Sequence, residues 1–406
     1  MIDLDGSTLE GGGQLTRVAL SLSAIYRLPI RVSRVRANRG SKFSKRGAGA
    51  SGGLKESHLA ALHWLADMCN AKTQGDEVGS EEFVFRPSSK RGLIRGPSDS
   101  TIELRNPGSV WLVLQALLPF ILFAIDVPVL ELTLKGGTNV SKSMSGEYVQ
   151  QVLIPTLHRI GLPDIEVDIV KRGWTSPVSQ IGEVKVMIKA AKRHPFVLPA
   201  FDVAERGAIK RVAVTILAHT EAMRNSLRVE VIKALGSQFP AEISVDVVID
   251  EESGSDSRLY LLLVAHTANG WVLGRDCLYN RRIRTDREAR VMAEKASENV
   301  VGQLTMELSK GGCVDEYLQD QLVIWQALAS GASRVDAGRH GADHDEGSLH
   351  TKTVRWVCEQ MMGNHNLFQA DGRCVGTQPY DARTISRSDI AEMTPVLEEA
   401  AIDDEG

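Results

Sequence analysis

Four glycine-rich turns in this chain are each followed by an apolar stretch with helical spacing, and this arrangement restricts the fold most. The turns are EGGG (10–13), NPGS (106–109), GGTNVSKSMSG (136–146) and KGG (310–312). After the first turn, Leu15, Val18, Leu22 and Ile25 lie on one face of a helix over 14–26. Glycine lets the backbone turn sharply and approach a ligand closely. The chain therefore starts several helices after a glycine-rich turn, and at the first of them the backbone could approach a ligand.

Short alternating segments lie between these helices and indicate β-strands. They occupy 28–37, 81–87, 100–105 and 129–136. Strands that alternate with helices predict an α/β (α+β) chain of repeated strand–helix units. The repeats share the order and spacing of their strands and helices but not their amino-acid residues.

A different pattern begins near residue 187 and predicts a small β-α-β-β set. We expect a large domain over 1–186 plus 276–395, a small inserted α/β domain over 187–275, and an acidic, disordered tail over 396–406. A length of 406 residues suits two or three domains, or one large domain with an insertion.

The composition narrows the class of protein. The net charge of −4 gives no overall basic signature for nucleic acid, although a local patch suffices for phosphate contacts. The five cysteines form no CxxC pair, so we expect free thiols in a reducing compartment.

The N-terminus does not resemble a secretory signal. The apolar run 110–125 is shorter than the roughly 20 residues of a membrane span and contains Gln115 and Pro119, so a buried helix is expected and no membrane partner.

The turn EGGGQLTR predicts either a phosphate site or an ordinary glycine-rich turn. A helix that starts after it offers unpaired N–H groups and the positive end of a dipole. Gln14 and Arg17 project from its first turn. Both interpretations stay open on spacing alone.

The stretch DEYLQDQL (315–322) places an aromatic ring, a carboxylate and an amide on one helix face. Tyr317, Asp320 and Gln321 stand at i, i+3 and i+4. Together they would suit a nucleoside, although a solvated helix face has the same pattern. Gln115 lies within an apolar helix, where an amide needs a hydrogen bond. It is either a satisfied core residue or a ligand-binding one.

His350 lies where a polar, acidic run gives way to the helical pattern of 347–356. Histidine is a fair nucleophile that is unprotonated near neutral pH, so it could do chemistry or cap a helix. His340 and His344 are close in sequence, with acidic residues between them, and a metal site there is an alternative. A locally basic run, KFSKR (42–46), is either a solvated loop or an RNA contact.

Taken together, these segments resemble the RNA 3′-terminal phosphate cyclases. The motifs EYLQDQL and LHTKT are most similar to those of the eukaryotic members. The resemblance rests on LDGSTLEGGGQLTRVALSLS, NPGSVWLVLQALLP, KGGTN, AERG, GGCVDEYLQDQLVIWQALASGASRV and LHTKT, spaced over nearly the whole chain. It implies a large domain of repeated βαβαββ units carrying a small α/β insert. It also implies a nuclear (nucleoplasmic) location, with the cytosol as a second one.

The resemblance implies a ligase-type reaction that uses ATP and an RNA with a 3′-terminal phosphate. A histidine, matched by His350, would take AMP from ATP and release pyrophosphate. AMP would pass to the RNA 3′-phosphate, and the 2′-hydroxyl would then close a 2′,3′-cyclic phosphate and release AMP. The family's positions for ATP and AMP are matched by Gln115, Tyr317, Asp320, Gln321, Glu10, Gln14, Arg17 and Arg39. Glu10 would also hold a divalent metal, Mg²⁺ or Mn²⁺.

The chain departs from the family's pattern in several loops. Ser57 replaces a glutamine, and the loops around 41–57, 140–146 and 176–182 differ, as does SGSDS at 253–257. These changes bear on RNA handling more than on adenylation. One alternative is therefore a non-catalytic cyclase-like protein of ribosomal RNA processing. Others are an enolpyruvyl transferase and a metabolite-binding protein, which explain fewer residues.

Overall fold

The computed structural model describes residues 1–39, 52–89, 94–175, 179–189, 196–338, 347–369 and 371–379. Its first unit is a βαβαββ repeat whose sheet has the strand order β1-β2-β4-β3. The parallel pair β1–β2 is bridged by α1, as a crossover helix requires. The elements are β1 (Ile2–Asp5), α1 (Gly13–Tyr26), β2 (Ile30–Ser33), the 3₁₀ turn η1 (Ala37–Arg39), α2 (Glu56–Cys69), β3 (Lys72–Gln74) and β4 (Phe83–Arg86).

The second unit repeats this topology, with the strand order β5-β6-β8-β7. Again the first two strands are parallel and the last two antiparallel. Its second helix contains one π-helical turn, η2, between two α-helical parts. The elements are β5 (Asp99–Glu103), α3 (Val110–Ala124), β6 (Val129–Gly136), α4 (Gly146–Tyr148), η2 (Val149–Leu153), α5 (Ile154–Arg159), β7 (Ile165–Lys171) and β8 (Gly182–Lys189).

A third unit has the strand order β15-β14-β9 and resembles the first two in its β-α-β-α-β sequence. Its first strand is parallel to β14, and α8 lies between them in the chain. The elements are β9 (Asp202–Val203), α8 (Glu316–Leu328), β14 (Gly331–Val335), α9 (Leu349–Met362) and β15 (Arg373–Gly376). The mixed α/β fold of repeated units, predicted from the sequence, is confirmed.

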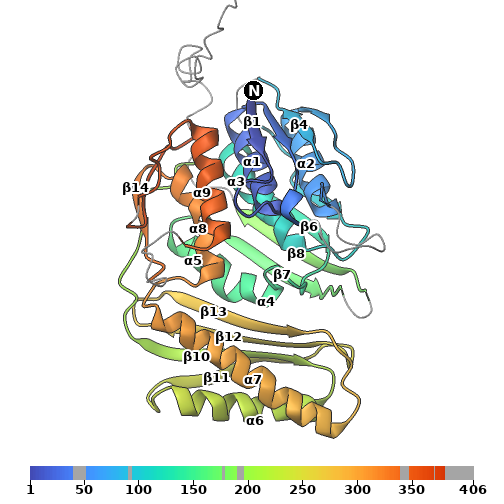
Figure 1. The fold of residues 1–406 in the computed structure, drawn as a ribbon, viewed down its shortest axis with the longest axis vertical. Helices are drawn as coiled ribbons and strands as arrows, with labels where there is room; N and C mark the ends of the chain where they lie inside the picture. Colours follow the sequence, from blue (N-terminus) through green and yellow to red (C-terminus); the bar gives the residue numbers. More distant parts are fainter. Residues whose placement is uncertain are drawn as a thin grey trace, which may run out of the picture.

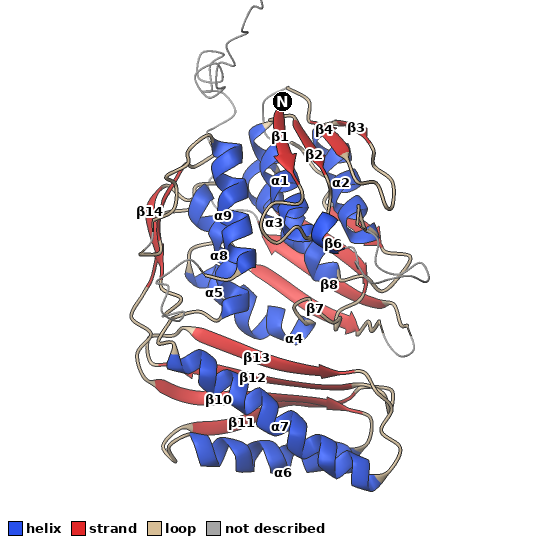
Figure 2. Cartoon of the chain, in the orientation of Figure 1, coloured by secondary structure: helices blue, strands red, loops and turns tan. Residues whose placement is uncertain are grey.

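Between β9 and α8 the chain builds a separate four-stranded sheet of order β11-β10-β12-β13. Figure 2 shows this sheet below the large body, with α6 and α7 on its outer side. The elements are β10 (Ile209–Ala218), α6 (Glu221–Gln238), β11 (Ser244–Glu252), β12 (Leu259–Thr267), β13 (Val272–Tyr279) and α7 (Asp286–Ser309).

The two faces of this small sheet belong to different hydrophobic cores, because side chains alternate along a strand. Leu261, Leu263 and Ala265 pack beneath α6 and α7. Tyr260 and Leu262 face the opposite way and join the core of the large body. The small sheet is therefore attached to the repeats through one of its own faces (Figure 1).

The predicted domain boundaries stay a prediction. The range 187–275 begins before β9, and α7, outside that range, packs on the small sheet. The tail over 396–406 and the run 42–46 lie outside the described residues.

The predicted buried helix is α3, whose side chains are buried on nearly every side. A helix that is apolar all round belongs in a core or a membrane. Within the described ranges, none of the helices combines the length and the apolar character needed to cross a bilayer.

The Asp315 carboxylate joins the small sheet to the large body. It caps the N-terminus of α8 by accepting hydrogen bonds from the backbone of Tyr317 and Leu318, at 3.0 and 2.9 Å. It also accepts from the Tyr148 hydroxyl at 2.7 Å and from the Gly274 N–H on β13 at 2.7 Å. The residue is fully buried, so these four donors replace water around its charge.

We expect Asp315→Ala to lower the free energy of unfolding by about 4 kcal/mol, because it removes a cap and leaves buried donors without acceptors. Thr285→Ala is the matched control, since Thr285 caps α7 through a single hydrogen bond at an exposed site. It should cost about 1 kcal/mol. Urea unfolding measures both, and equal losses would contradict a joining role for Asp315.

Candidate active site

The N-terminal ends of α1, α8 and α9 meet at one cavity of about 430 Å³. The β6–α4 loop and the strands β12 and β13 close its other side. Its volume is in the roughly 300–1,000 Å³ range of small-molecule sites. Unpaired N–H groups and positive dipole ends make helix N-termini suitable for anions.

His350 lies in the first turn of α9, after the N-cap Ser348, whose hydroxyl accepts from the Thr351 N–H. Its Nδ1 is 3.1 Å from the Oε2 of Glu10, and its side chain is 47% exposed. The carboxylate favours a proton on Nδ1, which leaves Nε2 with its lone pair. The Glu10 N–H also donates to the Thr353 hydroxyl at 3.2 Å, which ties the glycine-rich turn to α9.

Two glycines of the β1–α1 turn lie so close to neighbouring side chains that an added Cβ would displace them. A Cβ at Gly12 would overlap the Glu10 carboxylate, and one at Gly13 would overlap His58 Nε2 and Arg17. The His58 Nδ1 accepts from the Lys55 N–H at 3.0 Å. Burial, together with the charge of Arg17, holds the pKa of His58 well below its usual range. His58 is therefore a neutral, buried partner at the base of the turn.

Arg17 joins α1 to α3 beside the cavity. Its Nε donates to the Gln115 Oε1 at 2.7 Å, and its Nη2 donates to the Gln14 Oε1. Gln115 thus has a hydrogen-bonded oxygen, while Gln14 Nε2 is buried with no partner in the described part of the chain. A buried donor without an acceptor is costly, and an anion in the cavity would satisfy it.

Tyr317, Asp320 and Gln321 all line the cavity from the first turns of α8. The Gln321 amide donates to the Asp320 carboxyl. Burial raises the pKa of Asp320, against the lowering effects of that hydrogen bond and of the charges of His350 and Arg17. Tyr317 is 44% exposed as a residue, and the Arg275 guanidinium lies 4.5 Å from the centre of its ring.

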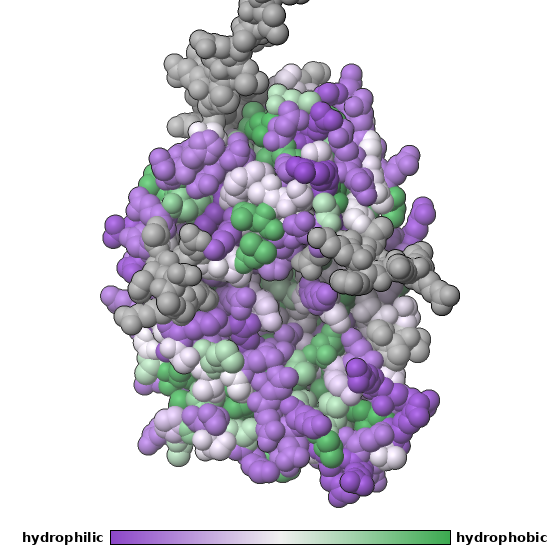
Figure 3. Space-filling view, viewed as in Figure 1, coloured by the Kyte–Doolittle hydropathy of each residue, from purple (hydrophilic) through white to green (hydrophobic). Residues whose placement is uncertain are grey.

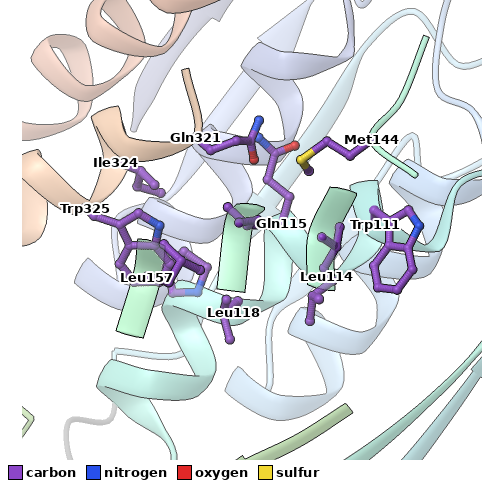
Figure 4. Close-up of a pocket in the computed structure, with 12 residues that line it drawn as sticks. Trp111, Leu114, Gln115, Leu118, Met144, Leu157, Gln321, Ile324 and Trp325 are labelled. Atoms are coloured by element: carbon purple, nitrogen blue, oxygen red, sulfur yellow. The ribbon is translucent and has the colours of Figure 1, made fainter. Parts of the chain in front are cut away.

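A small apolar recess of about 30 Å³ lies next to the larger cavity. Figure 4 shows Gln115 and Gln321 at one end of it, above a floor formed by Leu114, Leu118 and Trp325. Gln115, Gln321 and Met144 line both spaces. At about 30 Å³ the recess is too small for a nucleobase, so what it adds to the larger cavity is an apolar wall with two amides at its edge.

Sequence reasoning missed the wall that the small sheet contributes. Tyr260 and Asp276 line the cavity from β12 and β13, and the Tyr260 hydroxyl contacts Ser145 Oγ. Burial raises the pKa of Asp276 to about 6, although a hydrogen bond from Tyr260 and the charge of Arg275 lower it. No motif marks these residues, because strand residues of an insert face the site only through tertiary packing.

The structure therefore brings together Glu10, Gln14, Arg17, Gln115, Tyr317, Asp320, Gln321 and His350. Arg39 belongs to η1, but its side chain lies outside the described part, as do His340 and His344. Among the described residues no group of three or more metal-ligating side chains occurs. The five cysteines are free thiols, as expected.

The chain is similar to known proteins over almost its whole length. A family model described as RNA 3′-terminal phosphate cyclase matches residues 8–366. A protein of Pyrococcus furiosus with that name is 30% identical over 92% of this chain and 96% of its own. One of Saccharolobus islandicus is 31% identical over 82% of this chain and 88% of its own. A probable RNA 3′-terminal phosphate cyclase of Dictyostelium discoideum is 28% identical over 89% of this chain and 76% of its own.

We expect Asp276→Asn to stabilise the fold at pH 7.5 by about 2 kcal/mol and to change little at pH 4. The native carboxyl keeps its proton up to about pH 6, whereas the unfolded one loses it near 3.8, so wild-type stability falls between these values as pH rises. Urea unfolding at both pH values measures this. The exposed Asp168→Asn is the control and should show equal effects at both. A gain that did not depend on pH would contradict the raised pKa.

Proposed function

The chain belongs to the RNA 3′-terminal phosphate cyclase family, and from this premise we propose that it is an active, ATP-dependent cyclase. In this proposal it converts an RNA 3′-terminal phosphate to a 2′,3′-cyclic phosphodiester through a histidine–AMP intermediate and an RNA(3′)pp(5′)A intermediate. The observation that supports it most is the 3.1 Å contact of His350 with Glu10 where helix N-termini meet. A histidine whose tautomer is set by a carboxylate is suited to nucleophilic attack.

In the first step His350 Nε2 attacks the α-phosphorus of ATP. A P–N bond forms, the bond to the bridging oxygen breaks, and pyrophosphate leaves. Arg17 and the unsatisfied Gln14 amide stabilise the added negative charge at the α-phosphate. Glu10 stabilises the proton that stays on Nδ1, so the imidazole does not accumulate an uncompensated positive charge.

Two steps follow, and only the first of them takes place at His350. An oxygen of the RNA 3′-phosphate attacks the adenylyl phosphorus, the P–N bond breaks, and a phosphoanhydride forms. The neighbouring 2′-hydroxyl then attacks the RNA phosphorus, loses its proton, and expels AMP. The second reaction is intramolecular, so the chain needs chiefly to hold the terminal ribose in place.

The nucleoside half of ATP would lie against α3 and α8. The exposed face of Tyr317 offers a stacking surface, and the Asp320 carboxyl, which lines the same cavity, would hydrogen-bond a ribose hydroxyl. The amides of Gln115 and Gln321 at the apolar recess would read the edge of the base.

Glu10 is the residue that would hold Mg²⁺ or Mn²⁺. Mg²⁺ is commonly bound through one or two carboxylates plus substrate phosphates and water, which a single buried carboxylate beside a phosphate site fits. The bound ion would neutralise charge on the phosphates of ATP.

We also propose a nuclear location in the nucleoplasm, with the cytosol as a second location. The support is the likeness of EYLQDQL and LHTKT to eukaryotic members. Imaging of the tagged full chain tests this, and exclusion from the nucleus would contradict it.

The test of the reaction is labelling with ATP carrying ³²P at the α-phosphate, in the presence of magnesium, followed by denaturation. We expect label on the protein that is acid-labile and alkali-stable, as a phosphoramidate is. His350→Ala should abolish it completely without loss of fold. His365→Ala is the matched control, since His365 is exposed in the loop after α9, and it should label normally.

Label that persists in His350→Ala would identify another nucleophile. Folded wild-type protein that takes up no label would overturn the proposal in favour of a non-catalytic RNA-processing protein.

A second prediction concerns the glycine-rich turn. Gly12→Ala should lower the rate of adenylation at least 100-fold, because the added methyl group displaces the Glu10 carboxylate from His350. Gly302→Ala is the control: its added Cβ meets no atom of the described residues within 4 Å. It should leave the rate unchanged and stabilise α7 by about 0.5–1 kcal/mol. Normal adenylation by Gly12→Ala would contradict the role of the turn.

A further inference from the structure

The turn between β13 and α7, with the first two turns of α7, holds a concentration of arginine that the proposed reaction does not use. Residues 281–290 read RRIRTDREAR, with five arginines against two carboxylates. All five arginines, 281, 282, 284, 287 and 290, are exposed. In a chain with a net charge of −4, this is a marked local excess of positive charge.

Most of this charge is not neutralised by the protein. Arg282 pairs with Asp256 at 2.6 Å. The other four arginines have no ion pair with any residue that the structure describes. The nearby Glu288 carboxylate accepts from the backbone N–H of Arg284 at 2.7 Å. It therefore hydrogen-bonds the backbone before α7 rather than a guanidinium. Unpaired, exposed arginines are suited to bidentate contacts with phosphate.

These arginines continue directly from the wall of the cavity. Leu278 on β13 lines the cavity, and Arg281 follows within roughly 10 Å of extended chain. Between them, the Asn280 amide donates to Ser141 Oγ at 3.4 Å, which holds the turn against the β6–α4 loop. Lys142 of that loop also lines the cavity.

The figures place this region at the end of the small sheet where β13 passes into α7, on the right in Figure 1. Strongly hydrophilic side chains gather at that end in Figure 3. Arg287 and Arg290 are three residues apart on α7 and therefore lie on the same face. A basic path thus leads from Lys142, at the cavity, past Arg281 and Arg284 to α7.

We propose that this path binds the RNA strand upstream of the 3′-terminal phosphate. The inference rests on the proposed function and extends it, because it assigns the small sheet to substrate binding. The end of the strand occupies the cavity while its preceding phosphates lie along the arginines. Continuity with the cavity favours RNA over an acidic protein, since only a strand whose end is in the cavity must leave along its rim.

The experiment compares wild type with Arg284→Gln/Arg287→Gln, using a 3′-phosphorylated 12-nucleotide RNA and a 3′-phosphorylated dinucleotide. Lys72→Gln/Arg86→Gln is the matched control, since it removes two exposed charges from paired strands of the first unit. Fluorescence anisotropy gives the affinity for the 12-mer from 50 to 300 mM salt. Cyclisation assays give kcat and KM for both RNAs, and α-³²P labelling gives the adenylation of His350.

We expect the arginine variant to bind the 12-mer on the order of tenfold more weakly at 0.1 M salt, with a salt slope smaller by about 1.4, as two lost phosphate contacts on a single strand require. KM for the 12-mer should rise while its kcat stays unchanged. The dinucleotide kinetics and the adenylation should match wild type, and the control should match wild type throughout.

Unchanged 12-mer affinity and salt slope would overturn the inference and leave the arginines to another partner, such as an acidic protein. An equal loss for the dinucleotide would also overturn it, because the arginines would then act on the cavity itself. Absence of adenylation in wild type would overturn the proposed function alone, since RNA affinity is measured without catalysis and still tests the basic path.

Discussion

The buried carboxylate of Asp315 is the interaction on which the arrangement of the site depends. It accepts hydrogen bonds from the start of α8, from Tyr148 in the second unit and from Gly274 on β13. A buried charge must be satisfied by its surroundings, so these three segments are fixed relative to one another. Tyr317 and Asp320 follow within two turns of α8, and their positions are set by this contact.

The repeats explain why one cavity collects groups from the whole chain. Each unit contributes a helix at the cavity: α1 from the first, α3 from the second, α8 and α9 from the third. Three of these present their N-terminal ends, so the backbone of the helices already favours an anion at the cavity, apart from any side chain. Glu10 and His350 meet across almost the full length of the sequence because the first and third units pack together, with α1 against α9.

Sequence reasoning succeeded where local chemistry determines local structure. The glycine-rich turn, the helix face of Tyr317, Asp320 and Gln321, and the helix start at His350 were all visible as spacing. It did not give the Glu10–His350 contact or the hydrogen bond from Arg17 to Gln115, because each joins segments from different units. Tyr260 and Asp276 were missed for a further reason. Their strands read as ordinary parts of an insert, and only attachment of the small sheet through its inner face turns them toward the cavity.

That attachment also changes what the insert can contribute to the chemistry. A domain that merely decorated the surface would not place a carboxyl with a pKa of about 6 on the cavity wall. Nor would its next turn, anchored by Asn280 to the β6–α4 loop, carry exposed arginines within a few residues of the same cavity. The net charge is a sum over the whole chain, so it does not reveal the local group of arginines after β13. The electrostatic attraction of an RNA strand depends on the charges within about a Debye length of it. A net negative charge and a local excess of arginine are therefore compatible, and the loop at 140–146 lines the cavity where the repeats and the small sheet meet.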